Sequence, residues 1–188
     1  TNETLENKIL GIIGYGSIGK EIAKRAKKFN MKIYATRRLQ KNRLSNKNVD
    51  LLLPLCEIDY LLNHSDYIVI ACPLTYLTRN LINKKKFNIM NSNSILINVS
   101  RGEIIDEKEL INILINKKIK GAALDVFNLE PLSKDSPLFN LNNVLLSPHI
   151  AGNFNNYQSN VIKAFEENLN RYINHKSLRN RVCKKRQY

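Results

Sequence analysis

Short apolar runs alternate along the chain with segments of helical periodicity. Residues 8–13 form a compact apolar run, and residues 17–29 then carry apolar side chains at helical spacing with lysines between them. Such alternation indicates βαβ units on a parallel sheet. We predict strands at residues 8–13, 32–36, 50–53, 67–71, 94–98, 121–126 and 144–147, and helices at residues 17–29, 56–63, 84–90 and 106–116.

This pattern predicts an α/β fold: a doubly wound parallel sheet of Rossmann type with helices on both faces. Residues 37–48 are polar and basic, and we predict a loop there. Residues 153–174 form a last long helix with an apolar stripe, and no strand follows it. A stripe of this kind must pack against something, either the sheet or a neighbouring domain. Residues 176–188 form a basic tail.

Composition narrows the class of protein. With 188 residues, 43% of them hydrophobic, the chain has enough apolar material for one core. Three scattered cysteines without a CxxC pair exclude a disulfide scaffold or a zinc ribbon. No apolar run reaches 18 residues, and residues 1–8 do not resemble a secretory signal. We therefore expect a cytoplasmic protein without a membrane partner.

The net charge of +14, from 30 basic and 16 acidic residues, is typical of some nucleic-acid-binding proteins. Here the basic residues are spread along the chain, and asparagine and isoleucine are over-used together with lysine. This combination indicates drift in an AT-rich genome rather than selection for a polyanion. We do not expect nucleic acid to be a partner.

A GxGxxG motif directly follows the first predicted strand and opens an amphipathic helix. Gly14 permits a tight turn, Gly16 lets the backbone approach a pyrophosphate, and Gly19 lets helix and strand pack closely. The free N–H groups at the start of the helix, with the positive end of its dipole, then face the anion. The motif predicts a dinucleotide site.

The end of the second strand indicates which dinucleotide binds. An acidic residue here would bind the ribose hydroxyls of NAD, but the chain has Thr36, Arg37 and Arg38. A small hydroxyl and two guanidiniums suit a 2′-phosphate, because arginine meets phosphate oxygens with paired, charge-assisted hydrogen bonds. We expect NADP(H) to be preferred, with NAD(H) possible.

Four further segments, residues 64–75, 97–102, 123–131 and 147–152, carry a specific resemblance. In order and spacing the chain resembles the cofactor domain of the D-isomer-specific 2-hydroxyacid dehydrogenases, from about residue 5 to 182. Within that family its pattern is most similar to the glyoxylate/hydroxypyruvate reductases, which also replace the acidic residue and place arginine just after it.

The resemblance implies a catalytic set of Arg101, Glu130 and His149, with no metal. Reduction of a 2-oxo acid needs hydride at the carbonyl carbon, a proton for the oxygen and a cation for the carboxylate. His149 suits the proton donor, since histidine is the residue type that ordinarily exchanges protons near neutral pH. Glu130 would orient the imidazole, and Arg101 would bind the carboxylate and polarise the carbonyl. Arg101 and His149 follow strands, where ligands bind in this fold.

The resemblance also implies cofactor contacts along the same edge of the sheet. They involve the pyrophosphate, the adenosine-side ribose, a phosphate-side loop and the nicotinamide end, where a carboxylate would bind the carboxamide. In that order the positions are Ser17 and Ile18, Cys72 and Pro73, Thr78, and Ser100 with Asp125.

We divide the chain into an NAD(P)-binding domain, residues 1–152, and an interdomain-type helix with the tail, residues 153–188. The family's second, substrate domain is absent from this sequence, so we expect a fragment, poorly active alone, of a homodimeric 2-oxo acid reductase. Two alternatives stay open: an NAD-dependent D-lactate or phosphoglycerate dehydrogenase, and a non-catalytic, dinucleotide-sensing interaction module.

Overall fold

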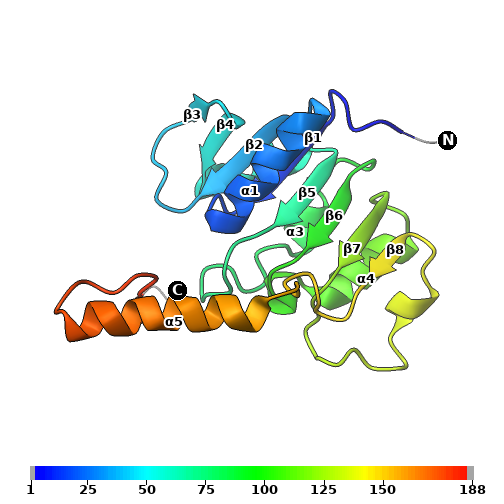
Figure 1. Cartoon of the computed structure of the whole chain (residues 1–188). Helices are drawn as coiled ribbons and strands as arrows, with labels where there is room; N and C mark the ends of the chain where they lie inside the picture. The colour runs from blue at the N-terminus through cyan, green and yellow to red at the C-terminus, as the bar shows by residue number, and fades with distance from the viewer. Residues whose placement is uncertain (1–2, 186–188) are drawn as a thin grey trace. The chain divides into compact units, whose positions relative to one another are not determined.

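The computed structural model describes residues 3–185 and forms two compact units, Thr1–His149 and Ile150–Tyr188. The first unit contains the sheet, and the second contains one long helix (Figure 1). The end of the predicted basic tail, residues 186–188, lies outside the described residues. The domain boundary that we place after residue 152 stays a prediction.

One eight-stranded sheet forms the centre of the first unit, with the order β3-β4-β2-β1-β5-β6-β7-β8. All neighbouring strands pair in parallel except β3, which pairs antiparallel with β4. The strands are β1 (Ile9–Ile13), β2 (Lys32–Arg37), β3 (Leu44–Asn46), β4 (Val49–Pro54), β5 (Tyr67–Ile70), β6 (Ile95–Asn98), β7 (Gly121–Leu124) and β8 (Val144–Leu146). The predicted fold class is confirmed.

The strand order places a topological switch point between β1 and β5. From β1 the chain first adds β2 and β4 on one side, and then returns to add β5 to β8 on the other. At such a point the connections leave the sheet in opposite directions, and a crevice opens at the carboxyl ends of the strands. The GxGxxG motif lies at this edge, directly after β1.

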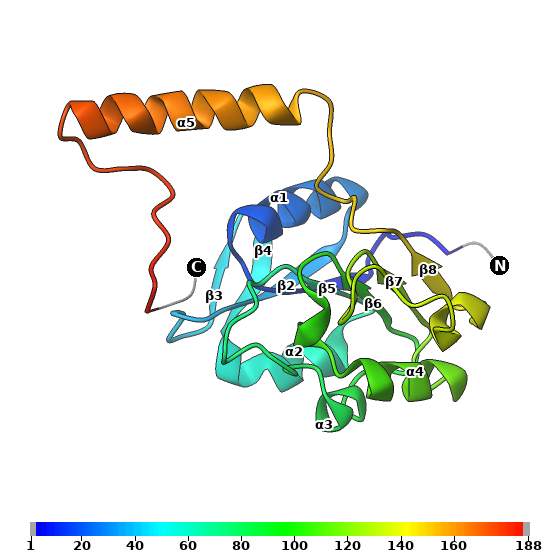
Figure 2. The ribbon, with the colours of Figure 1, turned by 90° about the horizontal axis from the view of Figure 1, so that it is seen from below.

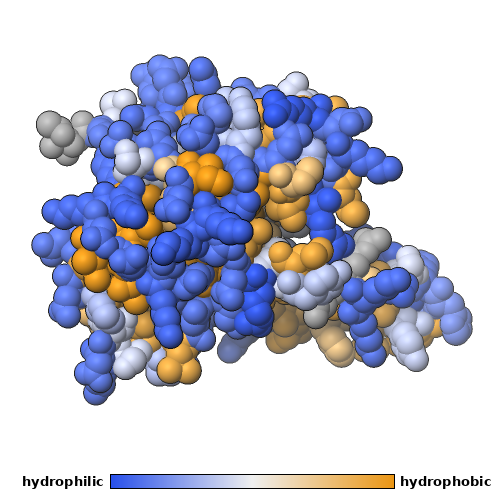
Figure 3. Space-filling model, turned by 180° about the vertical axis from the view of Figure 1, so that it is seen from behind, coloured by the Kyte–Doolittle hydropathy of each residue, from blue (hydrophilic) through white to orange (hydrophobic). Residues whose placement is uncertain are grey.

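Helices cover both faces of the sheet. Helix α1 lies on one face, and α2, α3 and α4 lie on the other (Figure 2). Each face has its own buried apolar cluster, one with Ala23 of α1 and one with Leu61 of α2 and Leu110 of α4. Most of the surface seen in Figure 3 is hydrophilic, with smaller apolar areas between. The helices are α1 (Ser17–Ala26), α2 (Ile58–His64), α3 (Lys84–Phe87) and α4 (Glu107–Ile115), with short 3₁₀ turns η1 (Lys27–Phe29), η2 (Leu55–Glu57), η3 (Gly102–Ile104) and η4 (Pro137–Asn140).

The expectation that residues 37–48 form only a loop is wrong in part, because β3 lies within them. All three residues of β3 are exposed, so no apolar alternation marks the strand. It is an edge strand in a tight hairpin, in which the Asn46 side chain accepts a hydrogen bond from the Asn48 N–H at 2.9 Å. Asparagine favours such turns because its side chain binds the backbone two residues on.

The second unit contains α5 (Tyr157–Ile173). The helix begins four residues later than predicted, because Asn156 adopts a left-handed backbone with φ of 70° and residues before it form turns. The side chains of the predicted apolar stripe are 46 to 66% exposed; they are Tyr157, Val161, Phe165, Leu169 and Ile173. Within residues 3–185, no helix combines the length and apolar character needed to cross a bilayer.

Candidate active site

The turn between β1 and α1 is built by close backbone contacts. Gly14 has φ of +103°, which side chains disfavour, and a Cβ there would lie 2.6 Å from the Cys72 nitrogen. A Cβ on Gly19 would lie 2.2 Å from the Gly14 carbonyl oxygen. At Gly16 a Cβ would meet nothing described within 4 Å. Two glycines therefore permit packing, and the third faces open space at the helix N-terminus.

This open space fits the pyrophosphate of a dinucleotide. Gly16 is the N-cap of α1, and among the described residues no side chain caps this helix and no acidic residue occupies its first turn. The first-turn amides and the positive end of the helix dipole are thus available to an anion. Ser17 and Ile18 begin the helix, and both are exposed.

The three residues at the end of β2 differ in exposure. The Thr36 side chain is buried, and its hydroxyl has no hydrogen-bond partner among the described residues. Its backbone carbonyl accepts hydrogen bonds from the N–H groups of Gly14 and Tyr15, at 3.2 and 2.9 Å. Arg37 is exposed and Arg38 half-buried. Thr36 thus holds the turn in place, and the guanidiniums are the groups nearer the surface.

The loop after β5 is held by hydrogen bonds within itself and by one hydrogen bond to the loop after β6. The Thr78 hydroxyl donates to the Pro73 carbonyl at 2.7 Å and accepts from the Thr75 N–H at 2.8 Å. Burial raises the pKa of the Cys72 thiol to about 11, and the Cys72 carbonyl accepts a hydrogen bond from the Ser100 hydroxyl. Thr78 is therefore occupied in shaping this loop, and Cys72 is uncharged at neutral pH.

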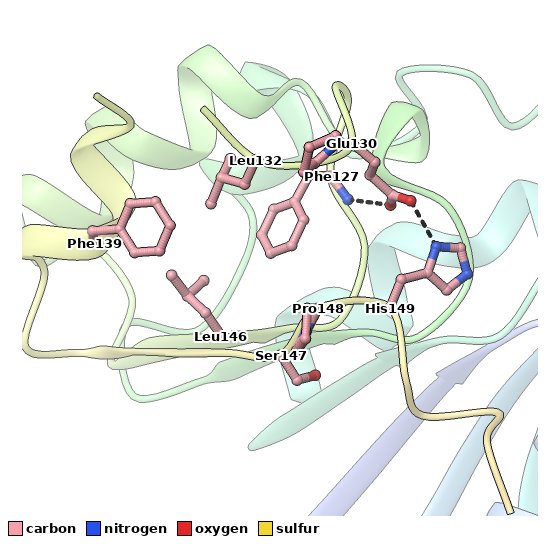
Figure 4. A pocket seen from close by; sticks show the side chains of 9 residues that line it. Phe127, Glu130, Leu132, Phe139, Leu146, Ser147, Pro148 and His149 are labelled. Atoms are coloured by element: carbon pink, nitrogen blue, oxygen red, sulfur yellow. Dashed lines mark hydrogen bonds and ion pairs between the residues drawn. The ribbon is translucent and has the colours of Figure 1, made fainter. Parts of the chain in front are cut away.

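Glu130 and His149 meet beyond the ends of β7 and β8 (Figure 4). The His149 Nδ1 lies 2.7 Å from one Glu130 carboxylate oxygen, and the other accepts the Phe127 N–H at 3.0 Å. The backbone N–H of His149 donates to the Asp125 carbonyl at 2.8 Å. The carboxylate is thus held by the backbone on one side and orients the imidazole with the other.

Charge and hydrogen bonding lower the pKa of Glu130. The largest cause is the hydrogen bond with His149, followed by the Phe127 N–H, and the positive charge of Arg101 adds to both. Arg101 therefore lies within electrostatic reach of Glu130. Its guanidinium is exposed and donates to the Ser100 carbonyl at 2.7 Å. The structure brings the three predicted catalytic residues to one region.

Asp125 lies directly after β7 and is only 5% exposed. Its carboxylate accepts a hydrogen bond from the Ser147 hydroxyl at 2.5 Å. Ser147 is a functional residue that the sequence analysis missed, although it precedes His149 by two residues within the segment 147–152. The bond links the end of β7 to the end of β8. It therefore connects Asp125, the predicted contact of the nicotinamide carboxamide, to the loop that carries His149.

An apolar cavity of about 340 Å³ lies beside the Glu130–His149 pair. Figure 4 shows Phe127, Leu132, Phe139 and Leu146 gathered at one end of it, and the pair at the other. Sequence analysis missed this cavity, because its apolar residues come from separate segments with no common spacing. No group of three His, Cys, Asp or Glu side chains suited to a metal ion occurs in residues 3–185.

Comparison with known proteins agrees with this architecture. Glyoxylate reductase of Pyrococcus furiosus is 42% identical over 146 residues, which cover 78% of this chain and 42% of the relative. Glyoxylate/hydroxypyruvate reductase B of Salmonella newport is 39% identical over 167 residues, which cover 88% of this chain and 50% of the relative. The chain thus spans about half the length of these curated relatives.

A solved structure has the same fold. The D-isomer specific 2-hydroxyacid dehydrogenase of Xanthobacter autotrophicus, in complex with NADPH and MES, superimposes with a TM-score of 0.91 at 29% identity, over 100% of this chain and 76% of that chain. Residues 1–151 match the profile of the D-isomer specific 2-hydroxyacid dehydrogenase NAD binding domain. The resemblance seen in the sequence is confirmed, and the chain belongs to the D-isomer specific 2-hydroxyacid dehydrogenase family.

Proposed function

We propose that the protein reduces a small 2-oxo acid with NADPH, with glyoxylate or hydroxypyruvate as substrate, and catalyses the reverse oxidation of the 2-hydroxy acid. The observation that carries this proposal is the Glu130–His149 hydrogen bond of 2.7 Å at the carboxyl edge of a dinucleotide-binding sheet. The names of the two relatives, both reductases of such acids, support the substrate class.

The site residues divide the chemistry between them. A bound nicotinamide supplies or accepts the hydride. His149 donates the proton to the oxygen of the new hydroxyl, and Glu130 holds its ring in one orientation through Nδ1. This leaves Nε2 as the nitrogen that faces the substrate. Because its pKa is lowered, Glu130 stays charged and stabilises the protonated imidazole.

Arg101 binds the substrate carboxylate through its exposed guanidinium. The same positive charge polarises the carbonyl, so that negative charge developing on oxygen is stabilised in the transition state. Asp125, held by Ser147, accepts a hydrogen bond from the carboxamide and fixes which ring face meets the substrate.

Preference for NADP(H) is part of the proposal. Arg37 and Arg38 follow Thr36 at the end of β2, where no carboxylate is present to bind a ribose hydroxyl. The NADPH bound to the Xanthobacter autotrophicus enzyme supports this choice. We also propose a homodimer acting in the cytoplasm, which light scattering and cell fractionation check.

The test uses the full-length protein as the cell makes it. NADPH absorbance is followed with a panel of 2-oxo acids, and glyoxylate or hydroxypyruvate should give the highest kcat/KM. Faster turnover of pyruvate or a phosphorylated hydroxypyruvate with NADH would favour the lactate or phosphoglycerate alternative. No turnover across the panel, with dinucleotide-dependent capture of a protein partner, would favour the interaction module and reject the proposal.

A further inference from the structure

The Asn98 side chain is fully buried at the end of β6 and takes no part in the proposed reaction steps. Its carboxamide spans the loop that follows. The Nδ2 donates to the Arg101 carbonyl at 2.9 Å, and the Oδ1 accepts from the Ser100 N–H at 3.1 Å. Both ends of the carboxamide are used, so its orientation is fixed and it fixes the turn in return.

The backbone of Asn98 also joins neighbouring strands at this edge. Its carbonyl accepts a hydrogen bond from the Asp125 N–H at 3.1 Å. The Ser100 hydroxyl, two residues further along the chain, donates to the Cys72 carbonyl. The loop bound by the Asn98 carboxamide therefore lies between the ends of β5 and β7, where a small displacement alters several contacts.

On its other side, this loop packs against the segment that carries Glu130. A Cβ on Gly102 would lie 2.0 Å from the Phe127 carbonyl carbon, so the two backbones touch. Phe127 donates its N–H to Glu130. Arg101 thus stands between two fixed points, the Asn98 carboxamide before it and the Gly102–Phe127 contact after it.

We propose that Asn98 is a positioning residue for Arg101. It does not touch the substrate. By binding the Arg101 carbonyl and the Ser100 N–H, it fixes the backbone of the loop and thereby the position of the Arg101 guanidinium at the sheet edge. The inference rests on the proposed function of Arg101 in binding the 2-oxo acid. Displacement of about 1 Å at such a group is enough to reduce turnover about 100-fold.

Asn98→Asp is the sharpest substitution, because it keeps the size and the acceptor for the Ser100 N–H. It loses the donor to the Arg101 carbonyl and places an oxygen against that carbonyl. Asn98→Ala removes both bonds and is the second variant. Ser94→Ala is the matched control, since the buried Ser94 hydroxyl lies just before the opposite end of β6 and has no partner among the described residues.

A double-mutant cycle in the full-length protein separates positioning from general loosening of the fold. Asn98→Asp should lower kcat/KM for the 2-oxo acid about 10- to 100-fold, with KM raised and kcat lowered, whereas Ser94→Ala changes it less than about 2-fold. In an Arg101→Met background, the same Asn98→Asp change should cost less than about 3-fold, because the group it positions is gone.

An equal fold-loss in both backgrounds would overturn the inference, since it would show a merely structural role. If the parent protein turns over no 2-oxo acid, the proposed function fails, and amide hydrogen exchange decides the inference separately. Exchange at residues 100–102 should then be faster in Asn98→Ala, which loses both bonds, than in Ser94→Ala, and equal rates would overturn it.

Discussion

The turn after β1 and the Glu130–His149 pair lie in opposite halves of the sheet's carboxyl edge and are built by different means. On the β1–β2 side, the turn depends on backbone packed against backbone, at Gly14 and Gly19, with no room for a Cβ. On the β6–β8 side, Glu130 and His149 are partly exposed and are held by hydrogen bonds. Substitution should therefore damage the turn through added volume, and the Glu130–His149 pair through a lost donor or acceptor.

Because of this contrast, substitutions that affect folding stability can be distinguished from substitutions that affect the reaction. Added atoms in a packed turn force the backbone apart and destabilise the folded state. Removal of a polar group from a partly exposed site leaves packing intact, and changes mainly the reaction. Variants in the turn after β1 and variants at the Glu130–His149 pair should fall into two classes when folding stability and turnover are measured on the same samples.

The largest expected effect is at the proton donor. His149→Gln should lower kcat of the full-length protein about 10²- to 10⁴-fold, because the glutamine side chain is not an acid that can supply the proton. The midpoint of thermal unfolding should change by only about 2 °C, since the ring is partly exposed. His64→Gln, on α2 and outside the site, is the control and should keep full activity. A parallel loss in both variants would contradict the assignment.

The second-largest effect is expected for substitution in the packed turn between β1 and α1. Gly19→Ala should destabilise the fold by about 2 to 3 kcal/mol, because the new Cβ would lie 2.2 Å from the Gly14 carbonyl oxygen. Gly16→Ala is the matched control, with open space around it. It should leave unfolding by denaturant unchanged but weaken NADPH binding about 10-fold or more, since the methyl group occupies the place of the phosphate. If both variants unfold alike, the contrast between packing and ligand space fails.

A smaller effect, on the preference for NADPH over NADH, is expected when the two arginines after Thr36 are replaced. Arg37→Ser combined with Arg38→Ser should weaken NADPH binding about 10-fold and leave NADH binding within about 2-fold, as measured by fluorescence titration. Arg25→Ser, on α1, removes a charge elsewhere and should change neither affinity. Equal weakening of both cofactors in the double variant would show that the arginines do not discriminate the 2′-phosphate.

The smallest expected effect is a shift in titration. The pKa of Glu130 is lowered, so its carboxylate remains charged at a pH where an ordinary glutamate is protonated, and the bond to His149 is lost only as pH falls through the lowered value. His149→Gln removes the largest cause and should move the pKa of Glu130 upward, as followed by carboxyl ¹³C NMR. An unchanged titration curve would show that His149 does not set the charge of Glu130.

The sequence predicted the parallel sheet and the placement of Arg101 and His149 after strands, because buried strands are marked by short apolar runs and parallel strands share one carboxyl edge. Glu130 follows no strand, and its place beside His149 came from the family resemblance. The bond between the two side chains depends on the turn at residues 127–130, and sequence spacing does not fix such a turn.

Three other features of the structure had no signal in the sequence from which they could be predicted. The β3 strand is polar and exposed, so its pairing is set by the hairpin turn rather than by apolar alternation. The burial of Thr36 follows from its place inside the packed turn, which residue type alone does not reveal. The apolar cavity arises from segments brought together only by the fold.

The central claim is that a pyridine dinucleotide lies across the carboxyl edge and reaches the catalytic half. An NMR titration of the chain with NADPH, with every backbone amide assigned, tests it most directly. The account predicts that the amides of Gly16, Ser100, Asp125 and His149 shift together, with one dissociation constant. Shifts confined to the turn after β1, or no shift at any of these amides, would contradict it.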